Sequence, residues 1–252
     1  MVQLGQNRLL KPIIFKSYPK VVAAQSTRNG GFGQVPYVSL NLGLYTKDTP
    51  ETVAQNRKAF FADLGFAPEQ TAGAHQVHGT SILAVETPGQ YEGFDALTTQ
   101  QKDILLTVTI ADCTPILIFD PISNSIAAVH AGWRGTVGQI VQKTVQQMIQ
   151  QFGVQPQDCL AYIGPCIDHC DFEVDEDVAQ HFTPEFKEWD EEKQKFYVDL
   201  KKANQSQLES IGLLAQNIEI SPFSTVTHNQ YFFSHRKEKG QTGRMLCAIG
   251  LR

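Results

Sequence analysis

The chain has 252 residues, a net charge of −5 and 42% hydrophobic residues, which is an ordinary composition for a globular protein. The mild negative charge argues against a nucleic-acid-binding protein, which would carry a strongly basic domain. No apolar run reaches the roughly 18 to 20 residues needed to cross a membrane, and the N-terminus lacks the apolar core of a signal peptide. We therefore expect one domain over residues 1–252, with neither nucleic acid nor membrane as a partner.

The five cysteines are an odd number in a chain that is not small, so a disulfide framework is not expected. Reduced thiols in the cytoplasm are the default for such a chain. A cysteine close to histidines then becomes a candidate metal ligand or nucleophile.

A helix is predicted over residues 50–64. Thr49 can cap it, Pro50 suits its first position and Gly65 ends it. One face of this helix gathers Val53, Arg57, Phe60, Phe61 and Leu64. Because Arg57 lies within this apolar stripe, it needs a partner, either a structural carboxylate or a bound phosphate that fits its planar guanidinium group. Arg28, which follows the first β-rich region, is a second candidate for phosphate binding.

The middle of the chain predicts a buried hairpin followed by a helix. Residues 103–110, 115–119 and 126–130 have the pattern of strands, and residues 120–125 have turn chemistry. A helix is predicted over residues 137–152, with Thr136 and Gln139 as a capping box and Gly153 after its end.

The later elements are shorter. Strands are predicted at 160–163, 218–220, 230–233 and 245–249, and helices at 175–182 and 200–211. The polar residues 188–195 have the composition of a solvated loop or helix end. Since strands and helices do not alternate regularly, we predict an α+β fold with a central mixed β-sheet flanked by helices.

The hairpin has a chemical consequence. Its turn is centred near residue 122 or 123, so Cys113 and His130 should meet at its open end. A thiolate beside an imidazole is either a pair of metal ligands or a nucleophile with its base. His75 and His78 form the one closely spaced histidine pair, and His78 could complete a Cys-His-His zinc site with an open position. A buried, chemically inert Cys113 with histidines that cap loops is the alternative.

The segment after His130 favours a functional site. Residues 131–136 link a strand to a helix start, where backbone N–H groups and Arg134 could bind an anion and Trp133 offers an aromatic face. The alternative is an ordinary turn with a surface arginine. The basic segment from His235 to Arg244 is either a solvated loop or the border of a phosphate site.

Three further possible donors, Cys166, His169 and Cys170, lie within five residues of one another. They have no distant fourth partner, so loop cysteines after a Gly-Pro turn are the favoured interpretation over a second zinc site.

Several motifs, taken in order, resemble one family. They are QVHG (76–79), ADCTPILIFDP (111–121), HAGWRGT (130–136), IGPCI (163–167), FEV (172–174) and FFSHR (232–236). Together with STRNGGFG and SLNLGL near the N-terminus, they resemble the YfiH-like, laccase-domain family over nearly the whole chain. Members of that family carry the names polyphenol oxidase, peptidoglycan editing factor and purine nucleoside phosphorylase.

The resemblance implies a single α+β domain with a catalytic zinc on His78, Cys113 and His130. It also implies phosphorolysis of purine nucleosides, with adenosine, inosine, guanosine and methylthioadenosine as substrates, and deamination of adenosine. Arg57 and Arg134 would then contact phosphate. Trp133 or Phe32 could stack on the purine, and Asp112 or Glu173 could carry a proton, although structural roles are equally open for these residues.

Three other functions remain open. A true multicopper oxidase is disfavoured because the seven histidines include no His-x-His pair, although adventitious copper could occupy the Cys-His-His group. A cysteine hydrolase would use Cys113 as nucleophile and His130 as base, and an enzyme that edits peptidoglycan precursors would belong to this class. A structural zinc domain would need a fourth ligand, which His75 could supply.

Overall fold

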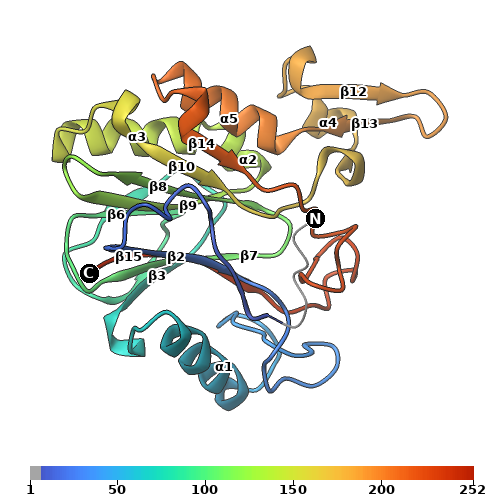
Figure 1. Cartoon of the computed structure of the whole chain (residues 1–252). Coiled ribbons are helices and arrows are strands. Elements are labelled where there is room, and N and C mark those ends of the chain that lie inside the picture. The colour runs from blue at the N-terminus through green and yellow to red at the C-terminus, as the bar shows by residue number, and fades with distance from the viewer. Residues whose placement is uncertain (1–6) are drawn as a thin grey trace.

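The computed structural model describes residues 7–252. Within this range the strands form two six-stranded sheets and a smaller three-stranded sheet. The two large sheets stack face to face, and helices cover the outer face of each (Figure 1). The α+β class with mixed sheets and flanking helices is confirmed, with the central sheet present as a stacked pair. None of the helices in the described part of the chain is long and apolar enough to cross a membrane.

Both large sheets are mixed, because each contains parallel as well as antiparallel strand pairs. The first sheet has the order β1 (Leu9–Leu10), β2 (Val21–Ser26), β15 (Met245–Leu251), β7 (Leu105–Ile110), β3 (Thr71–His75) and β5 (Gly89–Glu92). The second has the order β14 (Ile218–Ile220), β10 (Leu160–Ile163), β8 (Thr114–Asp120), β9 (Ser125–Ala131), β6 (Ala96–Thr99) and β4 (Ile82–Ala84). The small sheet contains β11 (Glu173–Val174), β13 (Lys195–Val198) and β12 (Lys187–Asp190).

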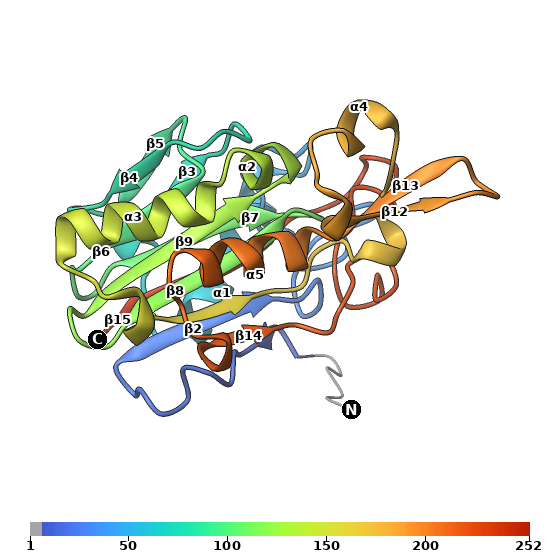
Figure 2. The ribbon, with the colours of Figure 1, turned by 90° about the horizontal axis from the view of Figure 1, so that it is seen from above.

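The helices divide between the two outer faces. They are α1 (Pro50–Asp63), α2 (Trp133–Val137), α3 (Ile140–Phe152), α4 (Glu176–Ala179) and α5 (Leu200–Ser210). Helix α1 lies beneath the first sheet, and α3 and α5 run across the second (Figures 1 and 2). The predicted start of α1 is confirmed, since the Thr49 hydroxyl accepts a hydrogen bond from the Thr52 N–H.

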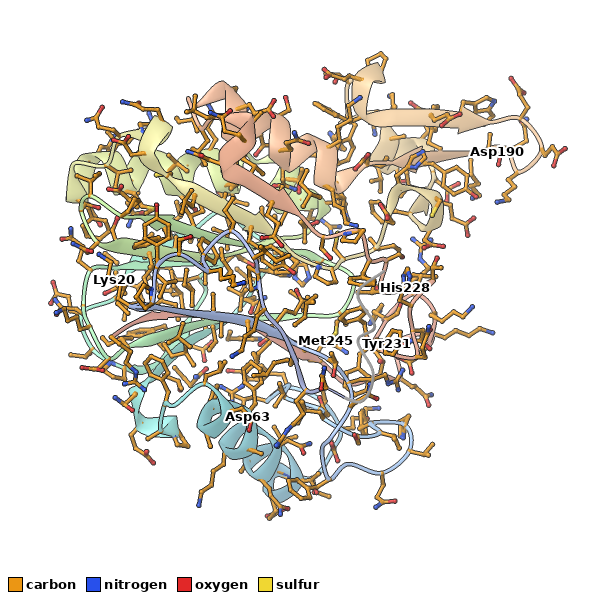
Figure 3. All side chains as sticks on the ribbon, in the orientation of Figure 1. Lys20, Asp63, Asp190, His228, Tyr231 and Met245 are labelled. Carbon is orange, nitrogen blue, oxygen red and sulfur yellow. The ribbon has the colours of Figure 1, made fainter. Side chains whose placement is uncertain are left out.

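Alternation along the central strands builds the core. On β8, Leu117 and Phe119 face the space between the sheets, whereas Ile116 and Ile118 pack toward α3. On β7, Leu106 packs between the sheets and Leu105 packs against α1. Because β8 is covered on both faces, its residues 116–119 form a continuous apolar run in the sequence. Side chains fill the spaces between the layers, which are α1, the first sheet, the second sheet, and the pair α3 and α5 (Figure 3).

Two predicted elements differ from the structure near the hairpin. The helix predicted over 137–152 is two helices, because the chain breaks at Gly138 and Gln139 adopts a left-handed conformation with φ of 61°. No capping box forms there, since Thr136 lies inside α2. The earlier start of α2 at Trp133 brings a helix N-terminus next to His130.

The C-terminal half holds three further differences. Residues 230–233 form turns instead of a strand, although Phe232 and Phe233 are fully buried. The polar residues 188–195 belong to the β12–β13 hairpin, which projects from the body in Figure 1. The helix predicted over 175–182 is reduced to the single turn of α4. The hairpin is defined by the pairing of β12 with β13, which the polar composition of these residues does not predict.

Candidate metal centre and active site

Two connections between the large sheets place chemical groups at one end of the sandwich. The segment from β3 to β4 carries His78, and the segment from β7 to β8 carries Asp112 and Cys113. The β8–β9 register pairs Thr114 with Ala131 and Pro115 with His130. Cys113 therefore lies next to His130, as the hairpin geometry predicts.

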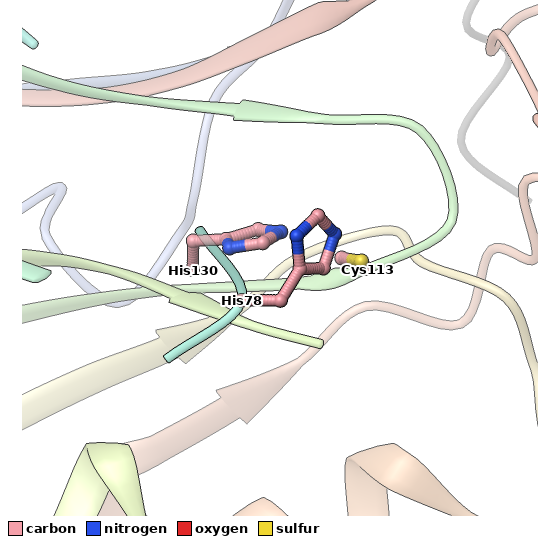
Figure 4. Close-up of side chains that lie close together, drawn as sticks. All are labelled: His78, Cys113 and His130. Atoms are coloured by element: carbon pink, nitrogen blue, oxygen red, sulfur yellow. The ribbon is translucent and has the colours of Figure 1, made fainter. Parts of the chain in front are cut away.

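His78, Cys113 and His130 form one compact group (Figure 4). One ligand atom from each residue lies within 4.8 Å of the others, and the two imidazole rings are nearly perpendicular with centroids 4.9 Å apart. Gly132 permits this approach, because a Cβ there would lie 3.2 Å from both Cys113 Sγ and His78 Cδ2. Sulfur with two imidazole nitrogens is a donor set that zinc prefers. The residues thus fit a single metal ion, and their metal-binding role stays a prediction.

Asp95 forms hydrogen bonds with the segment that carries His78 and with the ring of His130. The sequence did not predict this role. The buried carboxylate of Asp95 accepts hydrogen bonds from the backbone N–H groups of Val77, His78 and Gly79 at 3.2, 2.9 and 2.7 Å. It also bonds to Nδ1 of His130 at 2.8 Å. This contact leaves Nε2 of His130 for a metal, which is the usual arrangement of a ligating histidine and a carboxylate. The only sequence signal was a lone aspartate at the start of an apolar strand.

The charges in this group are strongly coupled. Burial alone would raise the pKa of the Cys113 thiol, but His130 and His78 outweigh it and lower that pKa to about 6. Burial alone would lower the pKa of His130, but Cys113 and Asp95 raise it to about 9. Burial would likewise raise the pKa of Asp95, and the hydrogen bonds from His130 and the backbone keep it below its ordinary value. The group therefore favours a thiolate, which is the form that binds metal or acts as a nucleophile.

The three side chains face a cavity of about 520 Å³, a size typical of small-molecule sites. One wall is apolar and contains Trp133, Ile167, Phe172 and Leu200. Leu44, Tyr45 and His75 also line the cavity. Trp133 and Phe32 were the two residues predicted to stack on a purine. Trp133 lines the cavity, whereas Phe32 is exposed and is not among the lining residues.

Two arginines, Arg236 and Arg244, line the cavity. Arg236 donates to the carbonyl oxygen of Glu173 at 3.1 Å, and Arg244 donates to the carbonyl oxygens of Thr242 and Gly243. Partial burial lowers the pKa of Arg244 from its ordinary value, and Asp112 and Cys113 oppose this effect. The basic segment from His235 to Arg244, for which a solvated loop was the other interpretation, thus borders the cavity.

The three predicted phosphate ligands lie elsewhere. Arg57 is buried, donates to the carbonyl oxygen of Leu42 at 2.9 Å and lies 5.1 Å from the ring centroid of Phe61, and burial lowers its pKa to about 10. Arg28 pairs with Glu238 at 3.0 Å, and the exposed Arg134 stacks on Trp133. None of the three is among the described residues that line the cavity.

The candidate proton carriers have structural contacts. The carboxylate of Asp112 accepts hydrogen bonds from the Thr225 hydroxyl at 2.6 Å and from the backbone N–H of Arg236 at 2.7 Å. It therefore anchors the segment from His235 to Arg244. Glu173 is exposed and lies 3.9 Å from the Arg236 guanidinium group.

The possible second metal site is not assembled in the described part of the chain. Cys166 is buried and Cys170 is exposed, while His169 lies 3.4 Å from Glu188. Burial raises the pKa of the Cys166 thiol to about 12, so this thiol stays protonated. His75, the possible fourth ligand, pairs with Glu92 and does not join the group of three.

Residues 22–252 match the family described as multi-copper polyphenol oxidoreductase laccase. The chain belongs to this family. The predicted resemblance to the YfiH-like, laccase-domain family is thus confirmed, and similar relatives and solved structures agree with it.

Among curated relatives, a purine nucleoside phosphorylase of Deinococcus radiodurans is 41% identical, covering 90% of this chain and 88% of its own length. The purine nucleoside phosphorylase YlmD of Bacillus subtilis is 32% identical, covering 92% and 89%. The crystal structure of YlmD from Geobacillus stearothermophilus superposes with a TM-score of 0.92 at 32% identity, covering 99% of this chain and 98% of that chain.

Proposed function

We propose that this protein is a zinc-dependent purine nucleoside phosphorylase that also deaminates adenosine. The observation that carries the proposal is one cavity in which a thiolate and two imidazoles converge near two arginine side chains. The names of the relatives support the same activity. Adenosine, inosine, guanosine and methylthioadenosine are the proposed substrates, so the partners are small molecules. Residues 1–252 would act as one domain, since both large sheets contribute to the cavity.

His78, Cys113 and His130 would hold the zinc ion, with Asp95 fixing the tautomer of His130. A zinc ion on three protein ligands polarises substrate oxygens and makes water a stronger nucleophile near neutral pH. That chemistry supports deamination as the second activity, because water must attack C6 of adenosine. Copper could bind the same atoms adventitiously.

The remaining groups would bind and orient the reactants. Phosphorolysis needs an anion site next to C1′ of the ribose, and the guanidinium groups of Arg236 and Arg244 are suited to phosphate. The apolar wall with Trp133 and Phe172 would hold the flat purine and exclude water. Arg57 would act indirectly by holding the carbonyl of Leu42, next to the loop that carries Leu44 and Tyr45. All five cysteines lie in the described residues as free thiols, which suits the cytoplasm.

The test is to incubate the zinc-loaded protein with inosine and phosphate and to measure hypoxanthine and ribose 1-phosphate. We expect equal amounts of both products from the parent protein and neither from the Cys113→Ala variant. Equal product formation by parent and variant would contradict the assignment of this site. Adenosine without phosphate should yield inosine in the same way.

A cysteine hydrolase is the second candidate, because Cys113, His130 and Asp95 form a nucleophile–base–carboxylate chain. Such an enzyme, including one that edits peptidoglycan precursors, would work without metal. Alkylation of Cys113 by iodoacetamide distinguishes the two candidates. We expect zinc to protect the thiol, whereas a hydrolase would be protected by an acyl substrate instead.

A further inference from the structure

Beyond the metal donors, the cavity contains an imidazole held in place from two sides. His75, at the end of β3, lines the same cavity as Trp133. Its Nδ1 is 2.9 Å from Glu92 Oε2, on the neighbouring strand β5. The ring of Tyr45 covers one face of the imidazole, with centroids 4.3 Å apart and an interplanar angle of 38°. A carboxylate and an aromatic ring thus contact this histidine, at a site where the side chains of His75 and Glu92 are 47% and 75% exposed.

The contact with Glu92 determines which ring nitrogen is available. With Nδ1–H donated to the carboxylate, Nε2 is the nitrogen that can exchange a proton with a bound molecule. In the described part of the chain, no protein hydrogen bond engages Nε2 of His75. This pattern of carboxylate, imidazole and free Nε2 is typical of a general acid or base.

The other acidic groups of the cavity are less suited to that task. Cys113, His78 and His130 belong to the donor group. Both carboxylate oxygens of Asp112 already accept hydrogen bonds from the protein. His235 also lines the cavity, but no hydrogen bond within the described residues orients its ring.

We propose that His75 is the general acid that protonates the leaving purine, and that Glu92 positions it. This inference rests on the proposed phosphorylase function and adds the residue that handles the proton on the base. His75 would be a catalytic residue because it touches the purine. Glu92 would be a positioning residue because it acts through His75.

The proposed reaction is a displacement at C1′ of the ribose. An oxygen of phosphate forms a bond to C1′ while the C1′–N9 bond breaks, and the bonding electron pair stays on the purine. The proton on Nε2 of the His75 imidazolium passes to N7, so the purine leaves as a neutral molecule. The products are ribose 1-phosphate, the free base and a neutral His75. The His75 side chain, which is 47% exposed, then regains a proton from solvent.

The experiment compares two nucleosides that differ in their need for an acid. Inosine requires protonation of its leaving base, whereas 7-methylguanosine carries a methyl group and a positive charge on N7 and does not. We measure kcat and KM for both with inorganic phosphate, using the zinc-loaded parent and the variants His75→Gln, Glu92→Gln and His235→Gln. His169→Gln is the matched control, because His169 also pairs with a glutamate but lies outside the cavity lining.

For His75→Gln we expect kcat on inosine to fall about 100-fold, a typical contribution of one general acid, with a change of less than about threefold on 7-methylguanosine. Glu92→Gln should show a smaller loss with the same selectivity, and His169→Gln should match the parent. Equal losses on both nucleosides, no loss in His75→Gln, or a selective loss in His235→Gln would overturn the role of His75 and leave the phosphorylase function standing. A parent protein that cleaves neither nucleoside would overturn both proposals.

Discussion

Replacing Asp95 tests whether the carboxylate beneath the donor group sets its affinity for metal. Asp95 is 1% exposed and accepts hydrogen bonds from three backbone N–H groups and from Nδ1 of His130. Asp95→Asn keeps the size of the side chain but removes its charge and one acceptor oxygen. Since such supporting groups contribute about 10- to 100-fold to metal affinity, we expect zinc to bind the variant more weakly by about that factor.

Asp95→Ala should have a larger effect. It leaves the buried His130 ring and the turn at residues 77–79 without their acceptor, so the free energy of unfolding should fall by about 3 to 5 kcal/mol. Asparagine, which still accepts from part of the turn, should cost clearly less. The two variants therefore separate loss of charge from loss of all the hydrogen bonds.

Competition with a chromophoric chelator measures zinc affinity, and urea unfolding of the metal-free protein measures stability. A useful control is Asp103→Asn, because Asp103 forms an exposed ion pair with Arg252 and lies outside the cavity lining. Parent-like zinc affinity in Asp95→Asn would refute the role that we assign to this carboxylate.

Four further results are expected. Gly132→Ala should weaken zinc binding by about 1 to 3 kcal/mol, because its Cβ would crowd Cys113 and His78, and the same chelator competition measures this. Arg236→Gln and Arg244→Gln should raise KM for phosphate roughly 10- to 100-fold in steady-state assays, in line with the loss of a charge-assisted hydrogen bond. Arg134→Gln should leave KM for phosphate unchanged, and an increase there would favour the helix start at α2 as the anion site. Arg57→Met should lower the free energy of unfolding by about 1 to 3 kcal/mol in urea, because it loses its bond to the Leu42 carbonyl, with little change in KM for phosphate.

The parts of the fold that could be predicted are those whose local pattern agrees with their final environment. Helix α1 has both its cap at Thr49 and an apolar face, and the hairpin of β8 and β9 has turn residues between two apolar runs. The division of strands between two sheets could not be predicted, because both faces of β8 are apolar and no period in the sequence marks which layer each face contacts. Strands such as β5 and β12 are short and polar, so only pairing with a neighbour defines them.

Two of the candidate metal donors could be located because the strands of a hairpin bring together residues at equal distances from its turn. Cys113 and His130 meet through the register of β8 and β9, whereas His78 required the resemblance to a family for its support. Asp95 and Glu92 gave no comparable signal, and the contact between His75 and Glu92 could not be predicted because it joins separate strands. The partner of Arg57 could not be predicted from its place in the apolar stripe, because the contacts of its guanidinium group are with the carbonyl oxygen of Leu42 and the ring of Phe61, which come from different segments.

The central claim is that one zinc ion on His78, Cys113 and His130 supports phosphorolysis in the adjacent cavity. Its most direct test is to titrate zinc into metal-free protein and to follow the phosphate-dependent release of hypoxanthine from inosine. We predict that the rate rises linearly and levels off at one equivalent of zinc per chain. Full phosphorolysis by the metal-free protein, or a rate that zinc does not change, would contradict the account.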